Sequence, residues 1–188
     1  STHDQFFMMA EGGKIDYASH ANDGGTVLRE VLDFDKAIKV AYDFYMQHPD
    51  ETLIVVTADH ETGGMALGNS DYTLNLKVLA EQKCSSDLLS DQLSALQKEA
   101  GKYLTWEQVK EVISKNTGLY TVVEISTEED QLLQAAFEQM MQHQGVEKSL
   151  YKDINALASK ALALLNQKSR LGWTSKGHTA SAVPVFAI

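Results

Sequence analysis

The sequence predicts an α/β protein in which a parallel sheet is interrupted by a helix-rich insert. Two short apolar runs, residues 6–10 and 53–58, lack the polar alternation of a half-exposed strand, so we expect two buried strands. Between them, apolar residues recur at helical spacing over residues 33–47. The order strand, helix, strand is typical of a crossover unit that joins parallel strands.

The first run ends directly at Glu11, which a glycine pair follows. We therefore expect the strand to present Glu11 at its end. Asp16 and His20 come next, four residues apart, and would share one helix face. A carboxylate and an imidazole held in this way can bind one cation, although an exposed pair without a metal is the alternative.

The helix predicted over residues 33–47 follows a loop signal at residues 22–25. Asp33 is a suitable N-cap, and His48 with Pro49 closes the helix. His48 would then lie near the negative end of the helix dipole, which explains it without a metal.

The second run ends in the adjacent residues Asp59 and His60, and Gly63 and Gly64 then allow a sharp turn. In an α/β sheet, ligands bind in the crevice outside the carboxyl ends of the strands. Asp59 and His60 are therefore candidate ligands, with a hydrogen-bonded polar turn as the alternative.

Residues 69–170 form the predicted insert, which follows an α/β segment at residues 1–68. Helices are expected at residues 86–100, after capping boxes at Thr105 and Ser126, and around residues 152–168. Short strands at residues 72–79 and 120–125 are weaker predictions. Within the insert, His143 is expected to have a structural role near a helix end.

Residues 171–188 return to the sheet. His178 stands between Gly177 and Thr179 on a loop that leads into an edge strand, because Pro184 lacks a ladder donor. The sequence stops inside this apolar run, and both ends are expected to be cut from a longer protein.

Composition limits the classes of partner. The chain has 188 residues and a formal net charge of −10, which disfavours binding to nucleic-acid phosphates or an anionic membrane surface. The one cysteine, Cys84, excludes an internal disulfide. The longest apolar helical stretch, residues 154–165, is too short to span a bilayer.

Six polar side chains are predicted at strand ends or turns, and their types suit metal ions. Carboxylates and histidines bind zinc, and a further carboxylate suits a harder ion such as magnesium. Two ions about 3.5–4 Å apart can clamp the attacking and leaving oxygens of a phosphoryl or sulfuryl transfer. The six candidate residues are Glu11, Asp16, His20, Asp59, His60 and His178.

Three motifs that carry these residues resemble, in the same order, the metal-binding motifs in the carboxyl-terminal half of alkaline phosphatases. They are residues 11–20 (EGGKIDYASH), 57–64 (TADHETGG) and 177–179 (GHT). The resemblance implies a three-layer α/β/α fold, present in part, and hydrolysis of phosphate monoesters at alkaline pH. It also implies a periplasmic or secreted parent protein. Members of the family commonly form homodimers, but the sequence leaves the oligomeric state open.

The resemblance implies a role for each candidate ligand. Asp16, His20 and His178 would bind the first zinc ion. Asp59 and His60 would bind the second zinc ion, and Glu11 would bind magnesium. The second zinc site and the magnesium site are incomplete here, because in the family each also takes an aspartate from the amino-terminal part.

The family's nucleophilic serine also precedes this region, and no position here matches it, so we expect no catalytic residue in this chain. The parent protein would then be a phosphatase that acts through a phosphoserine, and the fragment alone would be inactive. The alternative is a non-catalytic metal-binding or interaction domain. A phosphodiesterase or sulfatase of the same superfamily is the alternative chemistry.

Overall fold

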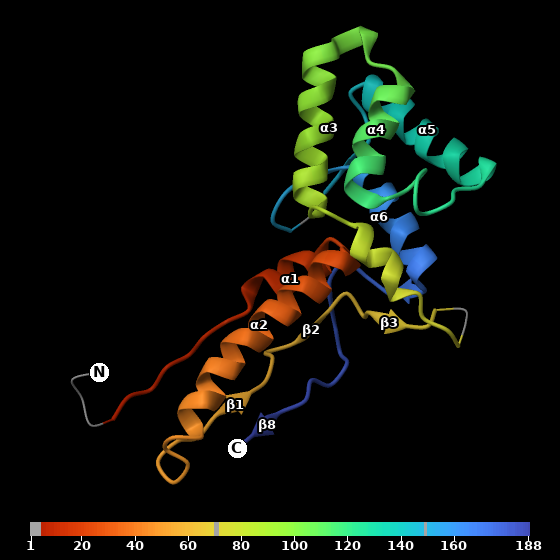
Figure 1. Ribbon diagram of the computed structural model, residues 1–188. Helices are drawn as coiled ribbons and strands as arrows, with labels where there is room; N and C mark the ends of the chain where they lie inside the picture. Colours follow the sequence, from red (N-terminus) through yellow and green to blue (C-terminus); the bar gives the residue numbers. More distant parts are fainter. Residues whose placement is uncertain (1–4, 70–71, 149) are drawn as a thin grey trace.

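The computed structural model describes residues 5–69, 72–148 and 150–188 and shows a helix-rich molecule with small sheets (Figure 1). Helices α3 to α6 gather at one end. Helices α1 and α2, the strand pair β1–β8 and both termini lie at the other end. The two ends are joined by packing of α2 against α6 and against the short helix η1.

Helix α1 spans Gly13–His20 and α2 spans Gly24–Tyr45. The predicted start of the second helix at Asp33 is wrong, because Asp23 caps it ten residues earlier by accepting a hydrogen bond from the Thr26 amide at 3.1 Å. The glycine pair that suggested a loop is inside the helix. A β carbon on Gly24 would lie 2.6 Å from the Leu171 side chain, so close packing requires the glycine.

Eight strands of two residues each form four antiparallel pairs within the described residues. The pairs are β1 (Val55–Val56) with β8 (Phe186–Ala187), β2 (Glu61–Thr62) with β7 (His178–Thr179), β3 (Ala66–Leu67) with β6 (Leu171–Gly172), and β4 (Val146–Glu147) with β5 (Ile154–Asn155). Residues 55–67 therefore run antiparallel to residues 171–187. The predicted parallel pairing is not found in the part of the chain that the structure describes.

The two apolar runs are extended but not buried. Residues 6–10 form no strand, and Phe7 is 93% exposed. Leu53 is 74% exposed beside the short strand β1. The prediction of buried strands is wrong for this chain, because burying a strand requires neighbours on its edges and faces, and in the described structure these segments have few.

The insert folds largely as predicted. Its helices are α3 (Ser86–Ala100), α4 (Trp106–Thr117), α5 (Thr127–Met141) and α6 (Ala156–Ser169), with 3₁₀ helices η1 (Leu76–Glu81) and η2 (Gly101–Tyr103). The capping boxes at Thr105 and Ser126 are confirmed. The weak strand predictions are wrong: η1 occupies much of residues 72–79, and residues 120–125 contribute only an isolated bridge between Leu119 and Val123.

The hydrophobic core lies in the insert and centres on α6, whose Leu157, Ala161 and Leu165 are fully buried. Helix α6 packs against α3, α4 and α5 and against η1. Among the described helices, none combines the length and apolarity needed to cross a membrane. The hydrophobic core therefore lies at one end of the molecule. Strand β6 packs against α6 in this core, and the chain continues from β6 to β7, which contains the candidate ligand His178.

Candidate metal centre

Helix α1 presents two candidate ligands, Asp16 and His20, on one face. His20 Nε2 lies 3.4 Å from Asp16 Oδ1, as expected for residues four apart on a helix. His20 is buried, whereas Asp16 is about one quarter exposed. The prediction that Asp16 and His20 share one helix face is confirmed.

The strand pair β2–β7 brings the second and third motifs together. Thr62 is the register partner of His178. His60, which directly precedes β2, stacks on the His178 ring with 3.6 Å between ring centroids and 23° between planes. Two imidazoles from segments more than a hundred residues apart therefore face the same space.

Asp16, His60 and His178 form a group whose ligand atoms all lie within 4.8 Å of one another. His178 Nε2 is 3.9 Å from Asp16 Oδ1, and the His20 and His178 ring centroids are 5.1 Å apart. A carboxylate and imidazole nitrogens at such separations suit a zinc ion, which binds nitrogen and oxygen ligands at about 2.0–2.2 Å after small side-chain shifts.

The hydrogen bonding of His20 leaves one of its ring nitrogens available to bind a metal ion. Its Nδ1 lies 2.5 Å from the Lys176 carbonyl oxygen, which can only accept, so Nδ1 carries the proton. Its Nε2 is buried and has no hydrogen-bond partner, with Asp16 and His178 nearby. A buried lone pair without a donor is costly unless something binds it, and a metal ion would do so.

Asp16 carries its negative charge readily at this site. Partial burial raises the pKa of Asp16, but hydrogen bonds from Tyr151 and Thr62 and the nearby rings of His20 and His60 outweigh it and hold the pKa below its usual value. An ionised carboxylate is the form that binds a metal, so the surroundings of Asp16 favour ligation.

The predicted glycine turn shapes the site. Gly63 and Gly64 have φ of +86° and +58°. A β carbon on Gly63 would lie 2.7 Å from the Trp173 ring, and one on Gly64 would overlap Thr174. Glu61 closes the turn, since its carboxylate accepts from the Gly64 amide at 2.7 Å and from the Thr179 hydroxyl. The turn thereby fixes β2 against β7.

Asp59 and Glu11 lie outside this group. The Asp59 side chain is 86% exposed and contacts its neighbour His60, with 3.4 Å between Asp59 Oδ2 and His60 Nε2. Glu11 is exposed beside Gly13. In the structure His60 therefore contacts Asp59 and also belongs to the group formed with Asp16 and His178.

Three contributors were not predicted from the sequence. The Thr62 hydroxyl donates to Asp16 Oδ1 at 2.7 Å, and the Lys176 carbonyl orients His20. The Tyr151 hydroxyl donates to Asp16 Oδ2 at 2.7 Å, which raises the pKa of Tyr151 to about 12. Alternation along an extended segment would have placed Thr62 on the same face as His60, whereas no sequence signal links Tyr151 to Asp16.

The hydroxyls nearest the ligand motifs are all hydrogen bonded. Ser19 donates to the Ile15 carbonyl at 2.7 Å, and Thr57 lies 3.2 Å from the carbonyl oxygens of Ala58 and Pro184. Thr62 donates to Asp16.

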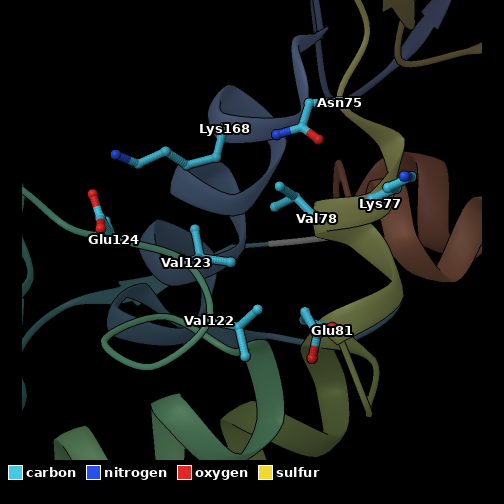
Figure 2. A pocket seen from close by; sticks show the side chains of 8 residues that line it. All are labelled: Asn75, Lys77, Val78, Glu81, Val122, Val123, Glu124 and Lys168. Carbon is cyan, nitrogen blue, oxygen red and sulfur yellow. The ribbon is translucent and has the colours of Figure 1, made fainter.

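A separate open pocket of about 450 Å³ lies between η1, residues 122–124 and α6 (Figure 2). Its charged groups have both signs, with Lys77 and Lys168 opposed by Glu81 and Glu124. Lys168 is already paired with Glu129 at 2.7 Å. The candidate ligands do not line this pocket, so the candidate metal centre lies elsewhere in the molecule.

Comparison with known proteins decides the family. The sequence model of the alkaline phosphatase family matches residues 2–188. The chain belongs to the alkaline phosphatase family. Alkaline phosphatase 4 of Bacillus subtilis is 32% identical over 183 residues, and the repressible alkaline phosphatase of Saccharomyces cerevisiae is 29% identical over 191 residues.

Solved alkaline phosphatase structures share the fold. The cold-active enzyme from a psychrophilic Shewanella matches 95% of the chain with a TM-score of 0.69 and 31% identity. The Thermus thermophilus alkaline phosphatase matches 94% with a TM-score of 0.63 and 26% identity. The predicted partial α/β fold of alkaline phosphatase type is therefore confirmed. The chain spans 34% and 31% of the two curated relatives named above, and 38% and 37% of these two solved chains.

Proposed function

We propose that these residues supply most of the metal ligands of a phosphatase that hydrolyses phosphate monoesters at alkaline pH through a phosphoserine. Membership of the alkaline phosphatase family supports the reaction class. The single observation that carries the proposal is the convergence of Asp16, His60 and His178 beside the unpartnered His20 Nε2. The serine nucleophile would come from a part of a longer polypeptide outside these residues.

Asp16, His20 and His178 would hold the first zinc ion, Asp59 and His60 the second, and Glu11 a magnesium ion. When bound, such ions polarise the phosphoryl oxygens and lower the pKa of the attacking group. The position of Asp59 next to His60 supports their shared role, since both can turn towards one ion from the end of the same segment. The second zinc site and the magnesium site would each need a further carboxylate.

The chain's own groups prepare these ligands. The Lys176 carbonyl holds the His20 proton on Nδ1 and leaves Nε2 free to bind. The Thr62 hydroxyl lies between Asp16 Oδ1 and His60 Nδ1, at 2.7 and 3.2 Å, and so links a carboxylate and an imidazole. These contacts limit the rotation of the His20, Asp16 and His60 side chains before any ion binds.

Zinc binding tests the ligand assignment. After dialysis, the 188-residue chain should retain one zinc ion per molecule, because the first site has three protein ligands here and the second has two. His178→Ala should weaken this binding by more than the 10–100-fold typical of losing a supporting hydrogen bond. His143→Ala, which alters an exposed histidine of the insert, should have no effect. Elemental analysis showing no zinc, or full occupancy of two sites, would contradict the assignment.

Turnover tests the catalytic part. The 188 residues alone should not cleave a chromogenic phosphate monoester in zinc and magnesium at alkaline pH, because the nucleophile is elsewhere. The longer polypeptide should cleave it, and His60→Ala should abolish that activity. Cleavage of a sulfate ester or phosphodiester in preference to the monoester would favour the alternative chemistry. A periplasmic or secreted location and a homodimer belong to the same proposal.

A further inference from the structure

A hairpin from the insert reaches the metal centre. It comprises the paired strands β4 and β5 and the residues between them, of which 146–148 and 150–155 are described, and we call it the insert hairpin. It is anchored on the core, since the Asn155 amide donates to the Ser90 hydroxyl at 2.8 Å and Lys152 pairs with Asp91 at 2.7 Å. The hairpin therefore connects the insert core to the ligands.

Tyr151 is the point of contact with α1. Its hydroxyl donates to Asp16 Oδ2 at 2.7 Å. Its ring stacks on Tyr17 with 3.8 Å between centroids and 22° between planes, and its edge approaches the His20 ring at 5.6 Å. The ring is thus fixed by aromatic packing, which leaves the hydroxyl aimed at one carboxylate oxygen.

The two oxygens of Asp16 have different surroundings. Oδ1 accepts a hydrogen bond from the Thr62 hydroxyl at 2.7 Å and faces the candidate ligand group, at 3.4 Å from His20 Nε2 and 3.9 Å from His178 Nε2. Oδ2 is occupied by the Tyr151 hydroxyl. A hydrogen bond to Oδ2 limits rotation of the carboxylate and so directs the remaining lone pair of Oδ1 towards the candidate ligand group, which is how a supporting hydrogen bond orients a metal ligand.

The insert hairpin supports His20 by a second route. Glu147 is ion-paired with Lys176 and also accepts from the Ser159 hydroxyl at 2.8 Å. The carbonyl oxygen of Lys176 accepts the hydrogen bond from His20 Nδ1–H. Both α1 ligands are therefore reached from the same hairpin, through Tyr151 and through Glu147.

We propose that Tyr151 is a positioning residue for the zinc ion bound by Asp16, and that the insert hairpin keeps the first zinc site in its binding geometry. The inference rests on the proposed function, because it requires Asp16 to be a zinc ligand. By this inference, residues of the insert that lie outside the three ligand motifs contribute to the metal centre.

The test compares zinc affinities of the 188-residue chain and of Tyr151→Phe by competition with a chromophoric chelator. The variant keeps the ring and its stacking on Tyr17 and loses only the hydroxyl. The zinc dissociation constant should rise 10–100-fold, while the thermal unfolding midpoint of the metal-free chain changes little. Tyr103→Phe, which alters an exposed tyrosine on η2, is the matched control and should bind zinc as the unmodified chain does.

The outcomes separate this inference from the proposed function. Zinc binding by the unmodified chain with equal affinity in Tyr151→Phe would overturn the inference and leave the ligand assignment intact. Absence of zinc binding by the unmodified chain would overturn both. A metal-free measurement adds a second check: amide hydrogen exchange over residues 146–155 should accelerate in Tyr151→Phe and not in Tyr103→Phe. Unchanged exchange would overturn the link between the hairpin and Asp16.

Discussion

At the scale of single residues, the candidate centre is defined by which atoms of the candidate ligands are hydrogen bonded and which are not. The Asp16 carboxylate accepts hydrogen bonds from the hydroxyls of Thr62 and Tyr151, and His20 Nδ1 donates to the backbone carbonyl oxygen of Lys176. These contacts fix orientation and protonation state, and they leave the buried His20 Nε2 unsatisfied. A group of polar side chains is a candidate metal site when hydrogen bonds from the protein fix the side chains but the atoms that face one another still lack hydrogen-bond partners.

Glu147→Gln should show a pH-dependent loss of stability. Partial burial raises the pKa of Glu147, but hydrogen bonds from Lys176 and Ser159 outweigh it and hold the pKa below its usual value. A lowered pKa stabilises the fold above the pKa of the unfolded chain, and this contribution is lost as the pH falls through the folded pKa. At pH 7 the variant should lose about 0.5–1 kcal/mol, since the pair is partly screened by solvent.

Urea unfolding of both proteins from pH 7 down to pH 3 measures this difference. The gap between them should shrink below about pH 4, where an ordinary glutamate is protonated. Glu138→Gln, which removes an exposed charge from α5, should show no such trend. A difference that persists unchanged at pH 3 would mean that the ion pair is not its cause.

At the scale of elements, helices and strand pairs differ in what determines them. Helices α4 and α5 begin where capping boxes predicted, because the capping contacts lie within four residues of sequence. Helix α2 begins earlier than predicted because Asp23 caps it, and its first two residues are glycines that pack closely against Leu171 and Gln82 from distant segments. The pairing of β2 with β7 likewise joins residues far apart in the chain. Local chemistry predicts helix ends better than strand partners.

Gly64→Ala should loosen the turn that carries the second motif. Gly64 has φ of +58°, and a β carbon there would overlap Thr174. Gly145→Ala is the matched control, because Gly145 has φ of +75° but a β carbon would meet its neighbours at 3.4 Å or more. Both variants should lose about 1–3 kcal/mol through backbone strain.

Only Gly64→Ala should lose a further amount, about 1–3 kcal/mol, through overpacking. It should also weaken zinc binding, since β2 and His60 would shift relative to His178. Urea unfolding and chelator competition on both variants measure these effects. Equal losses of stability and equal zinc affinities would contradict the role given to the Thr174 contact.

At the scale of the whole molecule, buried and exposed apolar side chains are unevenly divided. The insert contains most of the buried core. Helix α2 and strands β1 and β8 lie at the other end of the molecule (Figure 1), and many of the large apolar side chains there are exposed. Phe7, Val40, Leu53 and Phe186 are each more than half exposed. Large exposed apolar surface favours association with another surface, because association removes it from water. The predicted division at residues 68 and 170 remains a prediction, and residues 70–71 beside its first boundary lie outside the described residues.

The isolated chain should self-associate through this end. Phe186→Ser should weaken association about tenfold or more, because burying one phenylalanine contributes about 1.5–3 kcal/mol. Leu132→Ser, which alters an exposed residue on α5, should leave association unchanged. Sedimentation velocity over a range of concentrations measures the effect. A chain that stays monomeric at every concentration, or equal effects of both substitutions, would contradict this assignment of the surface.

The sequence by itself determined the residue types of the candidate ligands, the α1 face shared by Asp16 and His20, the glycine turn and the caps of the insert helices, because each depends on residues close together in the chain. Tertiary structure alone decided that His60 stacks on His178, that Lys176 and Tyr151 hold the α1 ligands, and that the apolar runs are exposed. These features depend on which distant segments meet. Spacing along a chain carries no information about partners contributed by another segment, and burial depends on what covers a strand as well as on its residues.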